Sequence, residues 1–219
     1  MKTKIALLTP TRGDRPQLLK KCKEMMIAQS HSFDFWEIVN YKPKGGKKDL
    51  VERVKAGVET ILSQGAKYDL IFIIEDDDFY HKDYLFRMVK RWKSVGKPDL
   101  FGIGESTYYH IKTNKYWHKY HPKHASLMNT AFTPRLASII KWEKVKDIFL
   151  DVYLWQAFKG VSTRFDNKIS LGIKHGIGLT GGIGHNQNAS IYQNVDESGE
   201  FLKSIVGNYY YKFYRSLPL

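Results

Sequence analysis

The sequence contains a single cysteine, Cys22, so no disulfide can form within the chain. A chain without internal disulfides is typical of a reducing compartment, and we expect a cytoplasmic protein, in the bacterial host cytoplasm if a phage encodes it. The apolar stretch near the N-terminus is too short for a secretory signal. No apolar run approaches the ~20 residues of a membrane-spanning helix, so we expect no transmembrane segment and at most peripheral contact with a membrane.

Acidic residues are scarce relative to basic ones. The chain has 22 Asp and Glu against 35 Lys and Arg, which gives a formal net charge of +13. An excess of this size favours an anionic partner. The candidates are a nucleic acid, an anionic membrane surface and a phosphorylated substrate. The charge alone does not choose among the three.

Length and composition are those of a globular protein. With 219 residues, 42% of them hydrophobic, the chain is long enough to bury a sizeable core. No repeat, low-complexity tract or linker divides it, so we predict one domain spanning residues 1–219.

The most informative stretch is Tyr68–Asp78, in which an apolar run ends in four consecutive carboxylates. Five apolar residues without alternation, Leu70 to Ile74, predict a strand buried on both faces, as in a parallel sheet under helices. Four like charges at its end need a counter-charge, and hard divalent cations prefer carboxylate oxygens. The alternative is a solvated acidic loop.

The first 78 residues predict the order β-α-β-α-β, which implies a parallel sheet with right-handed crossovers. The loop between the first strand and the first helix is polar and rich in Pro and Arg, and such loops usually bind ligands in α/β sheets. The alternative is a plain turn with solvated arginines. The predicted elements are strands at Lys4–Thr9, Phe35–Val39 and Leu70–Ile74 and helices at Gln17–Ala28 and Asp49–Gln64.

The rest of the chain predicts further helices and strands, with an aromatic hairpin between them. The hairpin interleaves Tyr, Trp, His and Lys, which suits stacking on bases or sugars, although ordinary packing of the aromatic rings is the alternative. The C-terminal helix is basic and aromatic; it either docks on the domain or contacts a membrane surface or an acidic partner. The predicted elements are helices at Asp83–Val95, Ala137–Lys141, Val145–Lys159 and Phe201–Tyr214, strands at Leu100–Gly104 and Phe165–Ile169, and a hairpin at Thr107–Tyr120.

Five separate pieces of the sequence, taken in order over residues 4–186, are "LLTPTRGDRP", "IIEDDD", "SLMNTAFTPRL", "FLDVYLWQAFKG" and "GGIGHN". Together they resemble the GT-A fold glycosyltransferases, most closely the inverting, family-two-like group. The resemblance implies an α/β, Rossmann-like fold with a mostly parallel central sheet flanked by helices. It also implies a nucleotide-binding half at 1–100, an acceptor-binding half at 101–190 and a C-terminal helix at 200–219.

The resemblance assigns roles to individual residues. It implies a metal site for Mn²⁺ or Mg²⁺ formed by Asp76, Asp78 and the late His185, and a catalytic base at Asp151. Asp147 is the reserve candidate for the base, and an ordinary surface aspartate is the alternative for Asp151. It implies a nucleotide-sugar donor, which we expect to be a UDP-sugar, bound by Thr9, Thr11, Arg12, Arg15, Asp76 and Asp77.

The sequence leaves the acceptor open. The basic charge and the aromatic hairpin favour DNA, specifically sugar transfer to a hydroxymethylated pyrimidine as in phage DNA hypermodification. A lipid-linked or surface glycan is the alternative acceptor. A different class of protein, a non-catalytic nucleic-acid-binding α/β domain, fits the charge equally. A nucleotidyltransferase would also use metal-bound carboxylates, but a glycine-rich triphosphate loop near the first strand is absent.

Overall fold

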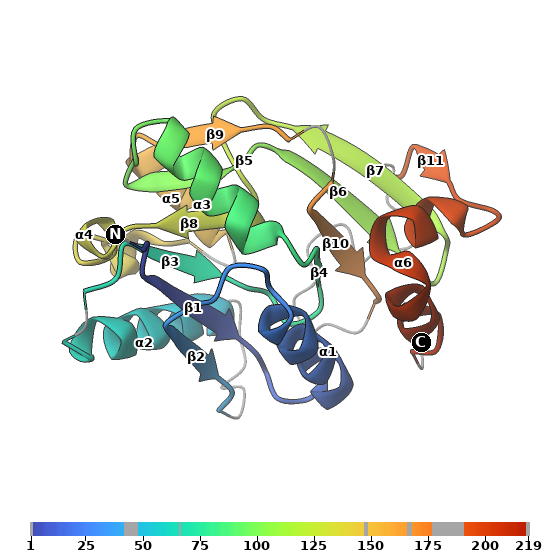
Figure 1. Cartoon of the computed structure of the whole chain (residues 1–219), viewed down its shortest axis with the longest axis horizontal. Coiled ribbons are helices and arrows are strands. Elements are labelled where there is room, and N and C mark those ends of the chain that lie inside the picture. The colour runs from blue at the N-terminus through green and yellow to red at the C-terminus, as the bar shows by residue number, and fades with distance from the viewer. Residues whose placement is uncertain are drawn as a thin grey trace.

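Two mixed β-sheets and the helices that cover them build the protein (Figure 1). The computed structural model describes residues 2–41, 48–65, 67–146, 149–165, 168–176 and 191–217. No helix in these ranges is long and apolar enough to cross a membrane.

The central sheet has six strands in the order β2-β1-β3-β8-β5-β9. β1 pairs in parallel with β2 and with β3, which confirms the predicted β-α-β-α-β start. β8 lies antiparallel between β3 and β5, so the sheet is mixed where the sequence predicted a mostly parallel one. The strands are β1 Ile5–Pro10, β2 Phe35–Val39, β3 Leu70–Ile73, β5 Leu100–Ile103, β8 Thr130–Phe132 and β9 Val161–Thr163.

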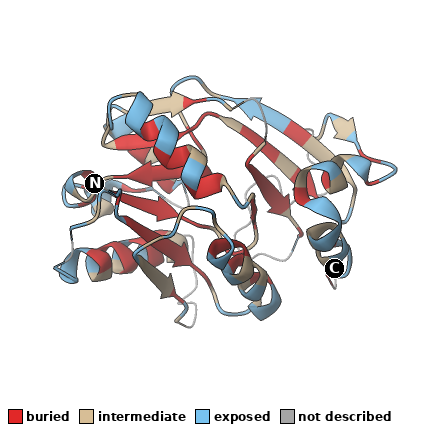
Figure 2. Ribbon diagram, in the orientation of Figure 1, coloured by how far each residue is buried: buried red, intermediate tan, exposed pale blue. Residues whose placement is uncertain are grey.

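Side chains from β1 and β3 alternate between two apolar layers, because successive strand residues point to opposite faces. Leu7 and Phe72 belong to one layer and Leu8 and Ile73 to the other, and all four are fully buried. Both faces of these strands are therefore covered, which explains the apolar runs without alternation. Figure 2 shows these strands as buried through the centre of the molecule.

The helices divide between the two layers. Three pack in the layer that contains Leu7, and three in the layer that contains Leu8. The first three are α1 Pro16–Ile27, α3 Tyr84–Ser94 and α6 Glu200–Arg215. The second three are α2 Asp49–Ser63, α4 Pro134–Ala137 and α5 Leu150–Ala157. Two short 3₁₀ segments lie at Leu127–Asn129 and Trp142–Lys144.

The second sheet has five strands in the order β11-β7-β6-β10-β4. The predicted hairpin is confirmed as β6 and β7, and Asn114 in its turn has a positive φ of 55°. The pairing of β10 with β4, which the sequence did not predict, brings the end of β10 to the acidic stretch that precedes β4. The strands are β4 Phe79–Tyr80, β6 Glu105–His110, β7 Lys115–Tyr120, β10 Ser170–Lys174 and β11 Asn194–Val195.

Several predicted elements differ from the structure. The helix expected at Ala137–Lys141 lies earlier in the chain, as α4 at Pro134–Ala137. The strand expected at Phe165–Ile169 is not found in its described part, since Phe165, Lys168 and Ile169 lie between β9 and β10, and residues 166–167 lie outside the described residues. The helix expected over Val145–Lys159 is shorter, because α5 begins only at Leu150 and ends at Ala157. The C-terminal helix is present, but Gly207 has a φ of 74° that kinks it and that favours glycine at this position.

Arg53 on α2 fixes the loop after β1. Its side chain is 1% exposed, and its Nη1 donates to the carbonyl oxygens of Thr11 at 2.7 Å and Tyr41 at 2.8 Å. Its Nε donates to Asp49 Oδ2 at 2.8 Å, so the buried charge is paired. The guanidinium thereby joins the ends of β1 and β2 to α2.

We expect Arg53→Met to destabilise the protein by about 3–5 kcal/mol, because the substitution removes a buried cation that donates to two backbone carbonyls and pairs with the Asp49 carboxylate. The free energy of unfolding from urea titration measures the effect. Lys55→Met, at an exposed position on the same helix, is the control and should change it by less than about 0.5 kcal/mol. Equal effects of the two substitutions would contradict the anchoring role of Arg53.

Candidate active site

The acidic stretch Glu75–Asp78 lies between β3 and β4. Ile74 continues the line of β3, since its amide donates to the carbonyl of Leu8 at 2.9 Å. Asp76 and Asp78 are 2% and 1% exposed, so the stretch is not the solvated loop that the sequence left open. Buried carboxylates need compensating charge, and two cations supply it.

Arg15, at the start of α1, bridges two of these carboxylates. Its Nη2 lies 2.6 Å from Asp76 Oδ1 and its Nη1 lies 2.6 Å from Asp77 Oδ2. Thr11 Oγ1 donates to the other oxygen of Asp76 at 2.5 Å. The loop after β1 and the end of β3 therefore meet through charged groups, and Asp76 and Asp77 already share one cation.

His175, directly after β10, completes this cluster. Its Nε2 lies 2.9 Å from Asp77 Oδ2 and 3.1 Å from Arg15 Nη1, and the residue is 1% exposed. A carboxylate can only accept and a guanidinium can only donate, so the shorter contact places the proton on Nε2. His175 and Arg15 therefore both donate to Asp77.

Asp78 and Lys174 form the other half of the cluster. Asp78 Oδ1 accepts from the amide of Ile173 at 2.8 Å, which holds this carboxylate against β10. Burial lowers the pKa of Lys174, but Asp78, Asp77 and Glu75 more than offset it, so its pKa lies above the ordinary value. Lys174 is therefore charged and acts as the second compensating cation.

Neighbouring carboxylates differ in pKa because their partners differ. Burial and the charge of Asp77 raise the pKa of Asp76 to about 6. Burial by itself would raise the pKa of Asp77, but the charge of Arg15 and the hydrogen bond from His175 hold this pKa well below the usual range. Burial raises the pKa of Glu75 to about 7, and the charges of Asp77 and Asp151 add to this. Asp77 is the anionic centre of the site.

The residues predicted to bind nucleotide fall into two groups. Thr11 and Arg15 contact the acidic cluster, together with Asp76 and Asp77 themselves. Thr9 and Arg12 do not, because Thr9 Oγ1 accepts from the indole of Trp36 at 2.9 Å and Arg12 pairs with Asp14. Thr9 therefore has a structural partner in β2.

Asp151, the predicted base, lies at the start of α5. Its Oδ2 is 3.4 Å from His124 Nε2, and its side chain is 20% exposed. Its charge also contributes to the raised pKa of Glu75 and of Tyr108. Asp151 is therefore a partly accessible carboxylate within electrostatic range of the acidic cluster, with a histidine beside it.

Two predicted residues, His185 and Asp147, lie outside the described residues. Within the described ranges, no three His, Cys, Asp or Glu side chains are placed to hold a metal ion. Asp76 and Asp77 do direct carboxylate oxygens at a shared cation, Arg15. These two residues fit part of an oxygen-ligand set for a divalent metal, and Asp78 Oδ1 accepts from the amide of Ile173.

His175, Lys174 and His124 are site residues that the sequence analysis did not identify. Lys174 and His175 end an apolar strand, which is the pattern that drew attention to Asp76 after β3. Their partners become visible only through the pairing of β10 with β4. His124 gave no sequence pattern that linked it to Asp151.

No protein-family model and no curated protein sequence matches this chain. Among solved structures, that of S. aureus TarS 1–349 in complex with UDP-GlcNAc matches with a TM-score of 0.53 and 8% identity, over 79% of this chain and 59% of TarS 1–349. A197 from STIV matches with a TM-score of 0.49 and 13% identity, over 74% of this chain and 82% of A197. The likeness to TarS is one of fold, and it supports the predicted GT-A fold.

The raised pKa of Glu75 makes a pH-dependent contribution to stability. The folded state binds this proton more tightly than the unfolded state, so the contribution is fully present below pH 4.5 and is lost as the pH rises through about 7. We expect Glu75→Gln to be more stable than wild type at pH 8 by about 1–3 kcal/mol, with no gain at pH 4. Urea unfolding at both pH values, with a chelator present, measures this.

Glu143→Gln, at an exposed position on the 3₁₀ segment Trp142–Lys144, is the matched control and should show the same pH dependence as wild type. If the free energy of unfolding of Glu75→Gln differs from that of wild type by the same amount at pH 4 and at pH 8, the raised pKa of Glu75 is contradicted.

Proposed function

We propose that this protein is a glycosyltransferase that moves a sugar from a UDP-sugar to a hydroxyl acceptor with inversion at the anomeric carbon. The proposal rests on Asp76 and Asp77, which follow β3. Both pair with Arg15, which belongs to the loop after β1. In α/β sheets, ligands bind at the carboxyl ends of adjacent strands. The GT-A fold and the nucleotide-sugar in the TarS structure are consistent with a nucleotide-sugar at this position.

Arg15 is the residue we assign to the donor diphosphate. A guanidinium has a fork of donors that matches phosphate oxygens. Arg15 donates to two carboxylates, and a second cation bound by these carboxylates would replace it there. A divalent Mn²⁺ or Mg²⁺ bound by Asp76 and Asp77 would stabilise the charge that develops on the departing diphosphate. With such an ion bound, Arg15 is free to contact the phosphates.

Asp151 is the residue we assign as the base. In the transfer, the acceptor oxygen forms a bond to the anomeric carbon while the bond from that carbon to the diphosphate oxygen breaks. The acceptor proton moves to Asp151, and the electron pair of the broken bond leaves with the UDP. His124, 3.4 Å from the Asp151 carboxylate, orients it. A base of this kind contributes about 100- to 10,000-fold to the rate.

The acceptor we propose is a hydroxymethylated pyrimidine in DNA, and the main support is the net charge of +13. The hairpin gives less support than the sequence suggested, because its rings pack internally. Tyr116 stacks on Phe201 at 3.7 Å between centroids, and Trp117 stacks on Tyr108 at 4.6 Å. A lipid-linked or surface glycan is the other acceptor, and transfer assays with both decide between them.

We expect Asp151→Asn to reduce sugar transfer by at least about 100-fold while binding of the UDP-sugar stays within twofold of wild type. Transfer is measured by incorporation of labelled sugar, and binding by calorimetry. Glu59→Gln, at an exposed position on α2, is the control and should retain activity. Full transfer activity in Asp151→Asn would remove this residue from the role of base.

Competition between Arg15 and a metal gives a second prediction. In wild type, manganese alone should raise the melting temperature little, whereas manganese with UDP should raise it by several degrees. In Arg15→Gln, manganese alone should raise it, because Asp76 and Asp77 no longer have their internal cation, and the added effect of UDP should shrink. A non-catalytic nucleic-acid-binding domain predicts no response to manganese and UDP in either protein.

A further inference from the structure

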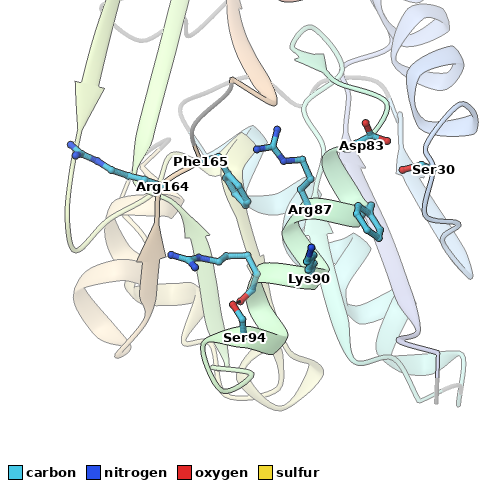
Figure 3. A pocket seen from close by; sticks show the side chains of 9 residues that line it. Ser30, Asp83, Arg87, Lys90, Ser94, Arg164 and Phe165 are labelled. Carbon is cyan, nitrogen blue, oxygen red and sulfur yellow. Dashed lines mark hydrogen bonds between the residues drawn. The ribbon is translucent and has the colours of Figure 1, made fainter.

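A groove on the outer side of α3 lies apart from the acidic cluster. It has a volume of about 890 Å³ and is bounded by α3 on one side and by Arg164 and Phe165, which follow β9, on the other (Figure 3). None of its lining residues belongs to the cluster of Arg15, Asp76, Asp77 and His175. The function of the acidic site does not account for it.

The groove is strongly basic. Four cations line it, Arg87, Lys90, Arg91 and Arg164, against one carboxylate, Asp83. Within the described part of the chain, none of the four cations forms an ion pair with a carboxylate. Asp83 instead lies 3.6 Å from His81 Nδ1. Among the described residues, the positive charge of the groove is therefore not neutralised by ion pairs.

Aromatic rings and one hydroxyl hold these cations in place. The guanidinium of Arg87 lies 5.0 Å from the centre of the Phe165 ring, and that of Arg164 lies 3.3 Å from the centre of the Tyr120 ring. Arg91 Nε donates to Thr163 Oγ1 at 2.7 Å. Guanidinium groups ordered in this way keep donors for phosphate at a reduced entropic cost.

The position of the groove indicates a long ligand. α3 packs in the apolar layer that contains Leu7, whereas α5, which carries Asp151, packs in the layer that contains Leu8. Arg87, Lys90 and Arg91 recur at helical spacing along one side of α3, so they present charge in a row. A row of cations away from the site of transfer suits a polymer with repeated phosphates.

Phe86 indicates which class of ligand the groove binds. It is 48% exposed at the edge of the groove, beside Arg87, and offers a ring face for stacking. Stacking on bases is sequence-tolerant and accompanies basic grooves in proteins that bind single strands. A membrane surface would instead require a broad apolar face on the helix, and Phe86 is the one large exposed apolar side chain described on α3.

We propose that this groove binds the phosphodiester backbone of a nucleic acid strand, with Phe86 stacking on a base. Its use as a second contact for the acceptor rests on the proposed function, but the binding itself does not. The groove anchors the strand while another part of the same molecule reaches the site at Asp151.

The test is fluorescence anisotropy with a labelled 20-nucleotide DNA of mixed sequence, single-stranded and duplex, at 50 and 200 mM salt without donor. Wild type should bind, and Arg87→Gln/Lys90→Gln/Arg164→Gln should bind at least about tenfold more weakly at 50 mM salt, with a smaller salt dependence. Arg91 is kept because of its bond to Thr163. These side chains are half-buried or exposed, and a thermal melt checks that the variant folds.

The control removes equal charge from the other helical layer. Lys55→Gln/Lys141→Gln/Lys144→Gln changes three exposed lysines and should alter the affinity by less than about threefold. Phe86→Ala should weaken single-strand binding about fivefold or more and leave binding of inorganic polyphosphate unchanged. Equal losses in the two triple variants, or no binding by wild type at 50 mM salt, would overturn the proposal.

Two further results separate this proposal from others. Binding of phosphatidylglycerol vesicles that exceeds DNA binding and depends on Arg87 would make the groove a membrane contact and overturn the nucleic-acid assignment. Hydrolysis of UDP-sugars by wild type is measured in parallel. If wild type binds DNA in the groove but does not hydrolyse UDP-sugars, the proposed function is wrong and the groove proposal stands. If it hydrolyses UDP-sugars but does not bind DNA, only the groove proposal is wrong.

Discussion

Charge compensation at the end of β3 is the constraint on which the rest of the site depends. Four consecutive carboxylates, Glu75 to Asp78, follow a fully buried strand, and they persist in the folded protein because Arg15 and Lys174 are held against them. Among the described residues, two cations face four carboxylates, so the cluster is short of positive charge. Burial raises the pKa of Asp76 and Glu75, and the charge of neighbouring carboxylates adds to it.

The fold delivers these cations from distant parts of the chain. Arg15 comes from the loop after β1, which Arg53 ties to the end of β2. Lys174 and His175 come from the end of β10, which the pairing with β4 places beside the carboxylates. The site is assembled from residues at the ends of three strands, and Asp151 contributes its charge from the second helical layer. This arrangement suits binding of a donor at the carboxylates and of an acceptor nearer Asp151.

The sequence predicted what depends on local pattern. The β-α-β-α-β start, the hairpin and the acidic cluster follow from apolar periodicity, turn residues and an abrupt change from apolar to charged, and the structure confirms them. The antiparallel β8 and the strand β10 were not predicted, because each is defined by pairing partners that are distant in the sequence. His175 was missed for the same reason, since its partner Asp77 is 98 residues away. The groove beside α3 was missed because Arg87 and Arg164 come together only through tertiary packing.

The central claim is that Asp76 and Asp77 form a cation site for a departing diphosphate and that Arg15 occupies it when no ligand is bound. A crystal grown with UDP and manganese, measured at the manganese absorption edge, tests this most directly. The account predicts an anomalous peak between the Asp76 and Asp77 carboxylates, with Arg15 moved onto the phosphates. Nucleotide bound while Arg15 still bridges both carboxylates, or manganese bound elsewhere, would contradict it.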